Sequence, residues 1–130
     1  MLKVTGKSIT VSNLDTFAIP FVIKNHIMTN DEKLIFTVRK LNAVKRRYLE
    51  DYELGDIVFQ KQITKSNTTE IPNLDGDIVG FQIIVSASKE EVALIPAGKY
   101  TYDLALIDTA RKAEIALIEP NPFNILEVLR

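Results

Sequence analysis

Two pairs of aspartates are the side chains in this sequence that come nearest to an acid–base arrangement. Asp103 and Asp108 lie in one short stretch, and Asp75 and Asp77 flank a glycine. Acid–base catalysis needs two carboxyls that face one cleft, one of them with a raised pKa. Asp103 and Asp108 would face opposite sides of a strand, and aspartates beside a turn glycine bond to local backbone. We therefore expect no catalytic residues and no enzyme activity.

Metal-binding residues are sparse. His26 is the single histidine, and there is no cysteine. A site built from nitrogen and sulfur ligands needs several such residues, and a calcium loop needs more oxygen ligands than Asp75 and Asp77 supply. We expect no metal site and no cofactor, and we expect His26 to lie in a surface loop. The lack of cysteine excludes disulfides and fits assembly in a reducing cytoplasm.

The segment Leu41–Asp56 carries the side chains best suited to contact a partner. Arg47, Tyr48 and Tyr52 are of types enriched where protein interfaces are strongest. The tyrosines could instead stack on a sugar ring, or cover an open end of the fold. A basic cluster lies nearby, but acidic residues follow it and cancel its field. The basic residues are Arg39, Lys40, Lys45, Arg46 and Arg47, and the acidic ones are Glu50, Asp51 and Glu53.

Composition indicates one globular domain over residues 1–130. Hydrophobic residues make up 46% and charged residues 25% of the chain, and the formal net charge is −1. Nucleic-acid-binding domains carry a large basic excess, so we expect neither nucleic acid nor a membrane surface as a partner. No apolar run reaches the length of about 18 residues that spans a bilayer. The N-terminus lacks an apolar stretch typical of a signal peptide, so we expect none.

The clearest structural element is a strand that ends at Asp108. Its side chains alternate, with Tyr100, Tyr102, Leu104 and Leu106 on one face, as a half-buried strand requires. Pro96-Ala97-Gly98 leads into it, and Gly98 suits a tight turn where a Cβ would clash. Tyr100 resembles a tyrosine corner, in which the hydroxyl bonds to backbone upstream. We expect Tyr100 to be buried and bonded in this way.

The rest of the pattern predicts an all-β sandwich of about 7–9 strands with one short helical turn. Pro20 cannot donate to a ladder and predicts an edge strand, Gly80 predicts a bulge or a close backbone approach, and Ser88 with Glu91 predicts a capping box. We expect a short helix or an ordered loop over Leu41–Asp56. The other strands are expected at Leu2–Val11, Thr16–Ile23, Glu32–Lys40, Ile57–Thr64, Ile78–Ala87, Ala113–Glu119 and Phe123–Leu129.

Three motifs resemble the immunoglobulin-like domain of bacteriophage tail and baseplate proteins, in particular the N-terminal domain of upper-baseplate proteins. The first motif consists of Leu94, Pro96, Ala97, Gly98, Tyr100, Tyr102, Asp103 and Leu104. The second consists of Asp15, Thr16, Phe17, Ile19 and Pro20, and the third runs over Leu34–Lys40. The resemblance covers Asp15 to Phe123, outside the inserted segment Leu41–Asp56.

This resemblance implies an immunoglobulin-like β-sandwich that serves as a structural component of a phage or prophage tail or baseplate. It implies protein–protein assembly contacts with other tail proteins or with further copies of the chain as a homo-oligomer, without a cofactor or a reaction. The expected location is the virion, assembled in the bacterial cytoplasm. The alternative is a carbohydrate-binding or other ligand-binding β-sandwich module, for which only Tyr48 and Tyr52 would be free.

Overall fold

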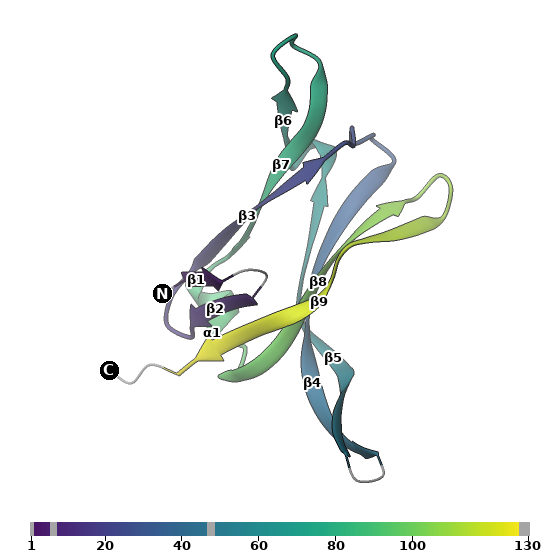
Figure 1. Cartoon of the computed structure of the whole chain (residues 1–130). Helices are drawn as coiled ribbons and strands as arrows, with labels where there is room; N and C mark the ends of the chain where they lie inside the picture. Colours follow the sequence, from purple (N-terminus) through teal and green to yellow (C-terminus); the bar gives the residue numbers. More distant parts are fainter. Residues whose placement is uncertain (1, 6–7, 47–48, 128–130) are drawn as a thin grey trace.

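The computed structural model describes residues 2–5, 8–46 and 49–127, with side chains described for residues 8–42 and 53–127. The described residues form nine strands in two sheets (Figure 1), with one 3-10 turn, η1 (Lys65–Asn67), and one short helix, α1 (Lys89–Ala93). The larger sheet has the order β1 (Leu2–Thr5), β2 (Ser8–Ser12), β9 (Ala113–Leu126), β8 (Gly98–Asp108), β4 (Glu32–Arg46) and β5 (Leu49–Thr64). The smaller sheet has the order β3 (Phe17–Lys24), β7 (Ile78–Ala87) and β6 (Thr69–Pro72).

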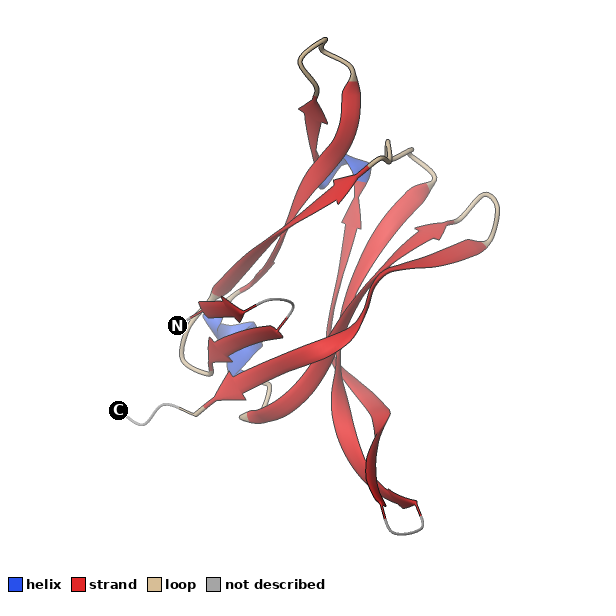
Figure 2. Ribbon diagram, viewed as in Figure 1, coloured by secondary structure: helices blue, strands red, loops and turns tan. Residues whose placement is uncertain are grey.

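The strand order is that of an immunoglobulin-like sandwich. The small sheet corresponds to strands B, E and D, and β4, β8 and β9 correspond to C, F and G, with β5 added beside β4 as in variable-type domains. At the other side, β2 pairs parallel to β9, with Ile9 opposite Phe123. Figure 2 shows that the described chain is almost entirely strand. The predicted all-β sandwich is confirmed.

The core lies between the two sheets and is rich in aromatic rings. Phe36 is fully buried near its centre and stacks on Tyr102, with ring centroids 5.6 Å apart. Phe123 meets the same ring edge-on, a geometry that adds to the stabilisation from buried area. The face of β8 predicted to be apolar is the buried one, comprising Tyr100, Tyr102, Leu104 and Leu106.

Local predictions about Pro20 and Ser88 are confirmed. The strand β3, which contains Pro20, pairs only with β7 and is an edge of its sheet. Ser88 accepts a hydrogen bond from the backbone N–H of Glu91, and the Glu91 side chain accepts one from the N–H of Ser88, which completes the capping box. In the part of the chain that the structure describes, no helix is long and apolar enough to cross a bilayer.

The prediction of a helix or loop over Leu41–Asp56 is wrong. This segment extends β4 and β5 into one long hairpin, which reaches beyond the sandwich (Figure 1). The register places Lys45 opposite Glu50. Continued pairing of two strands already joined in the sheet supplies backbone hydrogen bonds between them, and this outweighs a weak helical pattern without caps.

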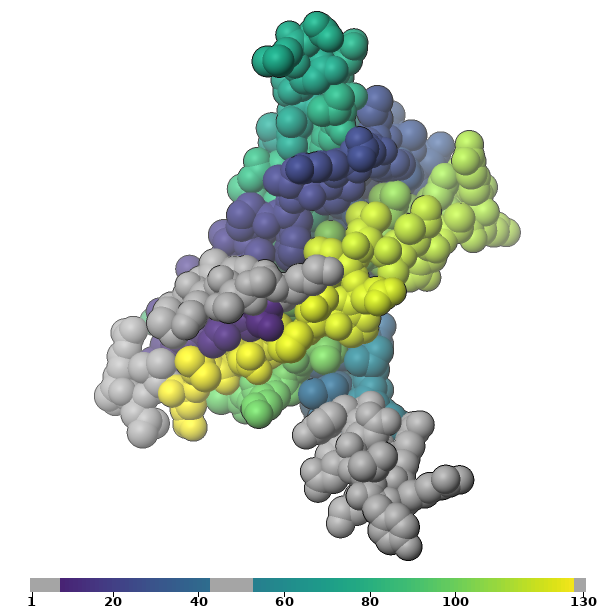
Figure 3. Space-filling model, in the orientation of Figure 1, coloured from purple at the N-terminus to yellow at the C-terminus, as the bar shows by residue number. Residues whose placement is uncertain are grey.

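Other strand boundaries also differ from the prediction. The single strand expected at Leu2–Val11 is two strands, β1 and β2, which pair antiparallel. The break expected at Asn121-Pro122 is absent, because β9 runs through it with register shifts opposite Tyr102 and Leu104. These irregularities are β-bulges or similar local disruptions, which accommodate residues that do not fit a regular ladder. Residues 69–72, which lie outside the expected strands, form β6. The β6–β7 hairpin projects from the sandwich at the end opposite to the β4–β5 hairpin, as the space-filling view also shows (Figure 3).

Candidate functional site

The three residues expected to form an interface belong to the β4–β5 hairpin. Arg47 and Tyr48 lie outside the described residues. Tyr52 lies in β5, opposite Ala43 in the register, and its side chain is outside the described part. Each aromatic side chain in residues 8–42 and 53–127 is buried or partly buried, so the described surface offers no aromatic platform for a sugar.

The corner before β8 has the expected tyrosine contact. Tyr100 is buried, and its hydroxyl donates a hydrogen bond to the carbonyl oxygen of Pro96. Burial raises the pKa of the Tyr100 hydroxyl. The clash expected for a Cβ at Gly98 is wrong, because the nearest atom would be the Tyr100 ring at 3.8 Å. The φ of Gly98, +157°, is one that other residues rarely adopt and accounts for the glycine.

The aspartate pairs do not form an acid–base site. Asp103 lies beside Arg39, with 3.8 Å between Nε and Oδ2. Partial burial raises the pKa of Asp103, while Arg39 opposes this rise. Asp108 accepts hydrogen bonds from the backbone of the β8–β9 turn, at Ala110 and Arg111. Both carboxylates therefore have local structural partners.

The other pair stabilises its own turn. The side-chain oxygen of Asn73 accepts hydrogen bonds from the backbone N–H groups of Asp75 and Asp77, at 2.9 and 3.0 Å. The aspartates thus lie in a turn held by asparagine, as local sequence chemistry favours. Among the residues that the structure describes, no cluster of histidine and acidic side chains could hold a metal ion.

His26 has a partner that the sequence did not indicate. Its Nε2 lies 2.9 Å from Oε2 of Glu32, a side chain that is 7% exposed. The other oxygen of Glu32 accepts a hydrogen bond from the backbone N–H of Thr29 at 2.8 Å. Glu32 therefore ties together the connection between β3 and β4, which explains why a buried carboxylate is tolerated there. The expected loop position of His26 holds, but its role is structural.

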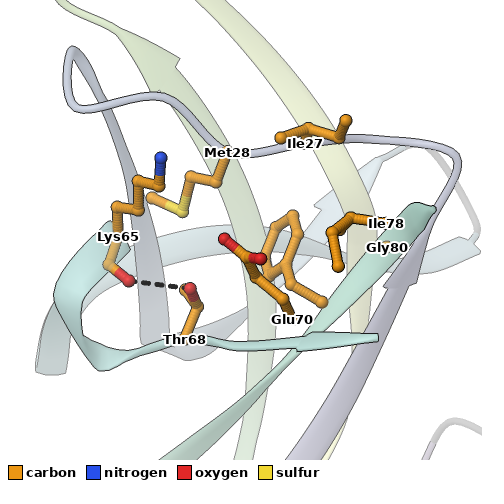
Figure 4. Close-up of a pocket in the computed structure, with 8 residues that line it drawn as sticks. Ile27, Met28, Lys65, Thr68, Glu70, Ile78 and Gly80 are labelled. Carbon is orange, nitrogen blue, oxygen red and sulfur yellow. Dashed lines mark hydrogen bonds between the residues drawn. The ribbon is translucent and has the colours of Figure 1, made fainter. Parts of the chain in front are cut away.

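A crevice beneath this connection is too small for a ligand. Figure 4 shows it between Met28, Lys65 and Glu70, with Thr68 donating a hydrogen bond to the carbonyl oxygen of Lys65 at 2.7 Å. The volume of the crevice is about 10 Å³. A cavity of that size holds about one water molecule.

The best candidate site is an open groove on the outer face of the large sheet. Its volume is about 590 Å³, within the range of ligand and peptide sites. The register explains how it forms, since Thr101 of β8 lies opposite Pro122 of β9. Lys99 is the one charged residue among the described residues that line it. The full lining consists of Leu41, Lys99, Tyr100, Thr101, Pro120, Asn121, Pro122 and Asn124.

Exposed apolar side chains extend this groove towards the β4–β5 hairpin. Leu54 lies opposite Leu41 in the register and is 52% exposed, and Ile57 lies opposite Arg39 and is 47% exposed. We call Leu54, Ile57 and the groove lining together the outer surface. Apolar groups grouped on one face in this way are typical of protein interaction sites.

Comparisons of the chain with protein-family models, with curated proteins and with solved structures gave no match. The fold defines the chain as an immunoglobulin-like sandwich. Its described surface holds an open groove on the large sheet. Sequence reasoning missed the groove because its lining comes from three strands far apart in the chain. The only local signal was the pair Pro120 and Pro122 within an alternating stretch.

Proposed function

We propose that this chain is a non-enzymatic structural component of a bacteriophage or prophage tail or baseplate, and that it acts through protein–protein contacts. The observation that carries the assembly role is the outer surface. It combines the open groove with the exposed side chains of Leu54 and Ile57 on a rigid sheet. A rigid sheet presents such groups with little loss of conformational entropy on binding.

The phage assignment rests on the residues that resemble the tail and baseplate domain. Pro96, Gly98 and Tyr100 form the corner before β8, with the hydroxyl of Tyr100 bonded to Pro96. Asp103 and Leu104 of the same motif follow in β8. These residues support the proposal because they form the tyrosine contact at the beginning of β8 that the resemblance implies.

The kind of surface favours a protein partner over a small molecule. The groove is open, and the groups within it are mainly prolines, asparagines and aliphatic carbon. Sites for small ligands enclose most of the ligand and direct several polar groups towards it. An open apolar surface with a polar rim is instead the anatomy of a protein interface.

Immunogold microscopy of phage particles tests this function. Prophage induction in the organism that encodes the chain should release particles whose tails or baseplates bind an antibody against the domain. A strain that lacks the chain should release particles with defective tails. Intact, infectious particles from that strain, without gold label in the parent, would contradict the proposal.

A second arm of the experiment tests the outer surface. Complementation of the deletion strain with Leu54→Asp plus Ile57→Asp should fail to restore tails, while the melting temperature of the purified domain stays nearly unchanged. The matched control is Val22→Asp plus Ile84→Asp, which alters residues of similar exposure on the small sheet. If the control variant fails and the outer-surface variant succeeds, the interface lies on the small sheet instead.

A further inference from the structure

The β6–β7 turn presents a leucine entirely to solvent. Leu74 is fully exposed at the turn. The turn around it is well bonded, because Asn73 accepts hydrogen bonds from Asp75, Gly76 and Asp77 and donates one from its own N–H to the carbonyl of Asp77 at 2.8 Å. A large apolar side chain on a rigid support is a preorganised anchor, since little entropy is lost when it binds.

The charges beside this leucine are opposite in sign to the charge in the groove. Asp75 and Asp77 follow Leu74 in the turn, whereas Lys99 is the charged residue in the groove lining that the structure describes. Arg39 lies beside the groove, opposite Thr101 in the register, but its charge is opposed by Asp103, so Lys99 carries the charge complementarity. The apolar part of the groove, formed by Leu41, Pro120 and Pro122, would receive the leucine side chain. The turn and the groove are therefore complementary in both apolarity and charge.

We propose that the β6–β7 turn of one copy of the chain docks in the groove of a second copy. Leu74 enters the groove between Leu41 and the prolines, and Asp75 or Asp77 approaches Lys99. This inference rests on the proposed function, because it names the partner of the surface already assigned to assembly. The partner is a further copy of the same chain.

The positions of the turn and the groove exclude a contact within one copy. Figure 1 shows the β6–β7 turn at one end of the molecule and the beginning of β8, which contributes to the groove, at the other. One chain cannot therefore insert its own turn into its own groove. Each copy offers one turn and one groove, so copies can join reciprocally as a two-fold pair or in series as a ring or a filament.

A single contact of this kind is weak in solution. The contact consists of one leucine side chain and one ion pair, so we expect a dissociation constant in the millimolar range or weaker. A closed ring gains from several contacts held together, which raises the effective concentration of each. The measurement must therefore detect weak association directly.

Nuclear magnetic resonance of the ¹⁵N-labelled chain meets this need. Amide spectra at about 0.05 and about 1 mM compare a concentration far below the expected dissociation constant with one that approaches it. We expect resonances from the β6–β7 turn and from Lys99–Thr101 to shift together as the concentration rises. Leu74→Asp removes the anchor, and Lys99→Glu reverses the charge of the groove, so each variant alone should lose these shifts.

Mixing the two variants gives the decisive result. The Leu74→Asp chain keeps an intact groove, and the Lys99→Glu chain keeps an intact turn, so an equal mixture should regain one contact and stop at a pair. An interface that does not join the turn to the groove would not be restored in this way. The matched control is Leu94→Asp, which changes another leucine that is 84% exposed and should leave the shifts of the wild type intact.

Three outcomes would overturn the contact. They are wild-type spectra that do not change with concentration, a mixture of folded variants that fails to regain the shifts, and loss of association in Leu94→Asp. If the contact is absent but the chain is still found in phage tails, the groove has a different partner and the proposed function stands. If the contact forms but the chain is absent from tails, the proposed function fails and the contact stands.

Discussion

The hydroxyl of Tyr100 donates a hydrogen bond to the carbonyl oxygen of Pro96, four residues earlier in the chain. This bond joins the beginning of β8 to the connection that follows α1. In immunoglobulin-like sandwiches a tyrosine at this corner holds the crossing between the two sheets. The contact therefore fixes the point where the chain enters the large sheet.

Loss of this hydroxyl should destabilise the domain. Tyr100→Phe keeps the buried ring but leaves the Pro96 carbonyl without its partner, which costs about 1–2 kcal/mol in the free energy of unfolding. Urea denaturation measures the change. Thr101→Ala, on the opposite face of the same strand, serves as the control for mutation in β8. A midpoint equal to that of the wild type would show that the bond contributes nothing to stability.

Gly80 should not accept even a methyl group. A Cβ at this position would lie 2.4 Å from the backbone carbonyl oxygen of Ile23 in the paired strand β3, and backbone cannot move aside as a side chain can. Gly80→Ala should therefore lower the free energy of unfolding by about 1–3 kcal/mol, as measured by urea denaturation. Ser86→Ala, at an exposed position in the same strand, should have little effect. Equal stabilities for the two variants would contradict this account of the glycine.

Asp103 should make stability depend on pH in the acidic range. Partial burial raises its pKa above the usual value of 3.8, so the folded chain holds the proton more tightly than the unfolded chain does. The contribution of Asp103 to the free energy of unfolding is complete below its usual pKa. This contribution is lost as the pH rises through the raised pKa of the folded chain. Asparagine does not titrate, so Asp103→Asn does not lose stability in this way. The stability of the variant relative to the wild type should therefore rise between about pH 3 and about pH 6.

The control for Asp103 is its cationic neighbour. Arg39 lowers the pKa of Asp103, so Arg39→Gln should raise that pKa further and make the loss of stability with pH steeper than in the wild type. Urea midpoints measured over the same pH range would detect both effects. Parallel curves for the wild type and Asp103→Asn would exclude titration of this carboxyl as the cause.

Pro20 should protect an open sheet edge rather than stabilise the fold. It is exposed, and β3 has a neighbour on one side only. Pro20→Val supplies the missing N–H donor, so stability should change by less than about 0.5 kcal/mol, while aggregation on warming should become faster. Light scattering measures the rate, with Ala18→Val as the control on the same strand. Equal rates for the two variants would argue against the protective role.

Local signals explain which parts of the fold the sequence could predict. The alternation from Tyr100 to Leu106 depends only on neighbouring residues, as do the capping box of Ser88 and Glu91 and the missing donor of Pro20. Each of these features holds in the structure. They could be predicted because the physical cause and its effect lie within a few residues of each other.

Leu41–Asp56 could not be predicted in the same way. Leu41, Val44, Tyr48 and Tyr52 fit a helical period, and the choice of strand depends on the pairing of β4 with β5 over the whole hairpin. The contact of His26 with Glu32 likewise depends on the path of the β3–β4 connection. These features follow from register and chain path, which are properties of the assembled sheet.

The candidate groove depends even more on the assembled sheet than these features do. Leu41, Thr101 and Pro122 come from three strands, and only the order β4, β8, β9 places them on one face. No short motif contains the groove. The groove could be recognised only once the strand order was known, whereas the class of fold could be predicted from local patterns.

The parallel pairing of β2 with β9 has a mechanical consequence. The beginning of β1 and the end of β9 lie on the same side of the molecule (Figure 1), and β1 pairs antiparallel with β2. A load applied between the ends would first peel β1 away one residue at a time. It would then pull β2 and β9 in opposite directions along their length, so the hydrogen bonds between Ile9–Ser12 and Phe123–Leu126 would share the force at once. The pairing of β2 with β9 therefore resists stretching between the two ends of the domain.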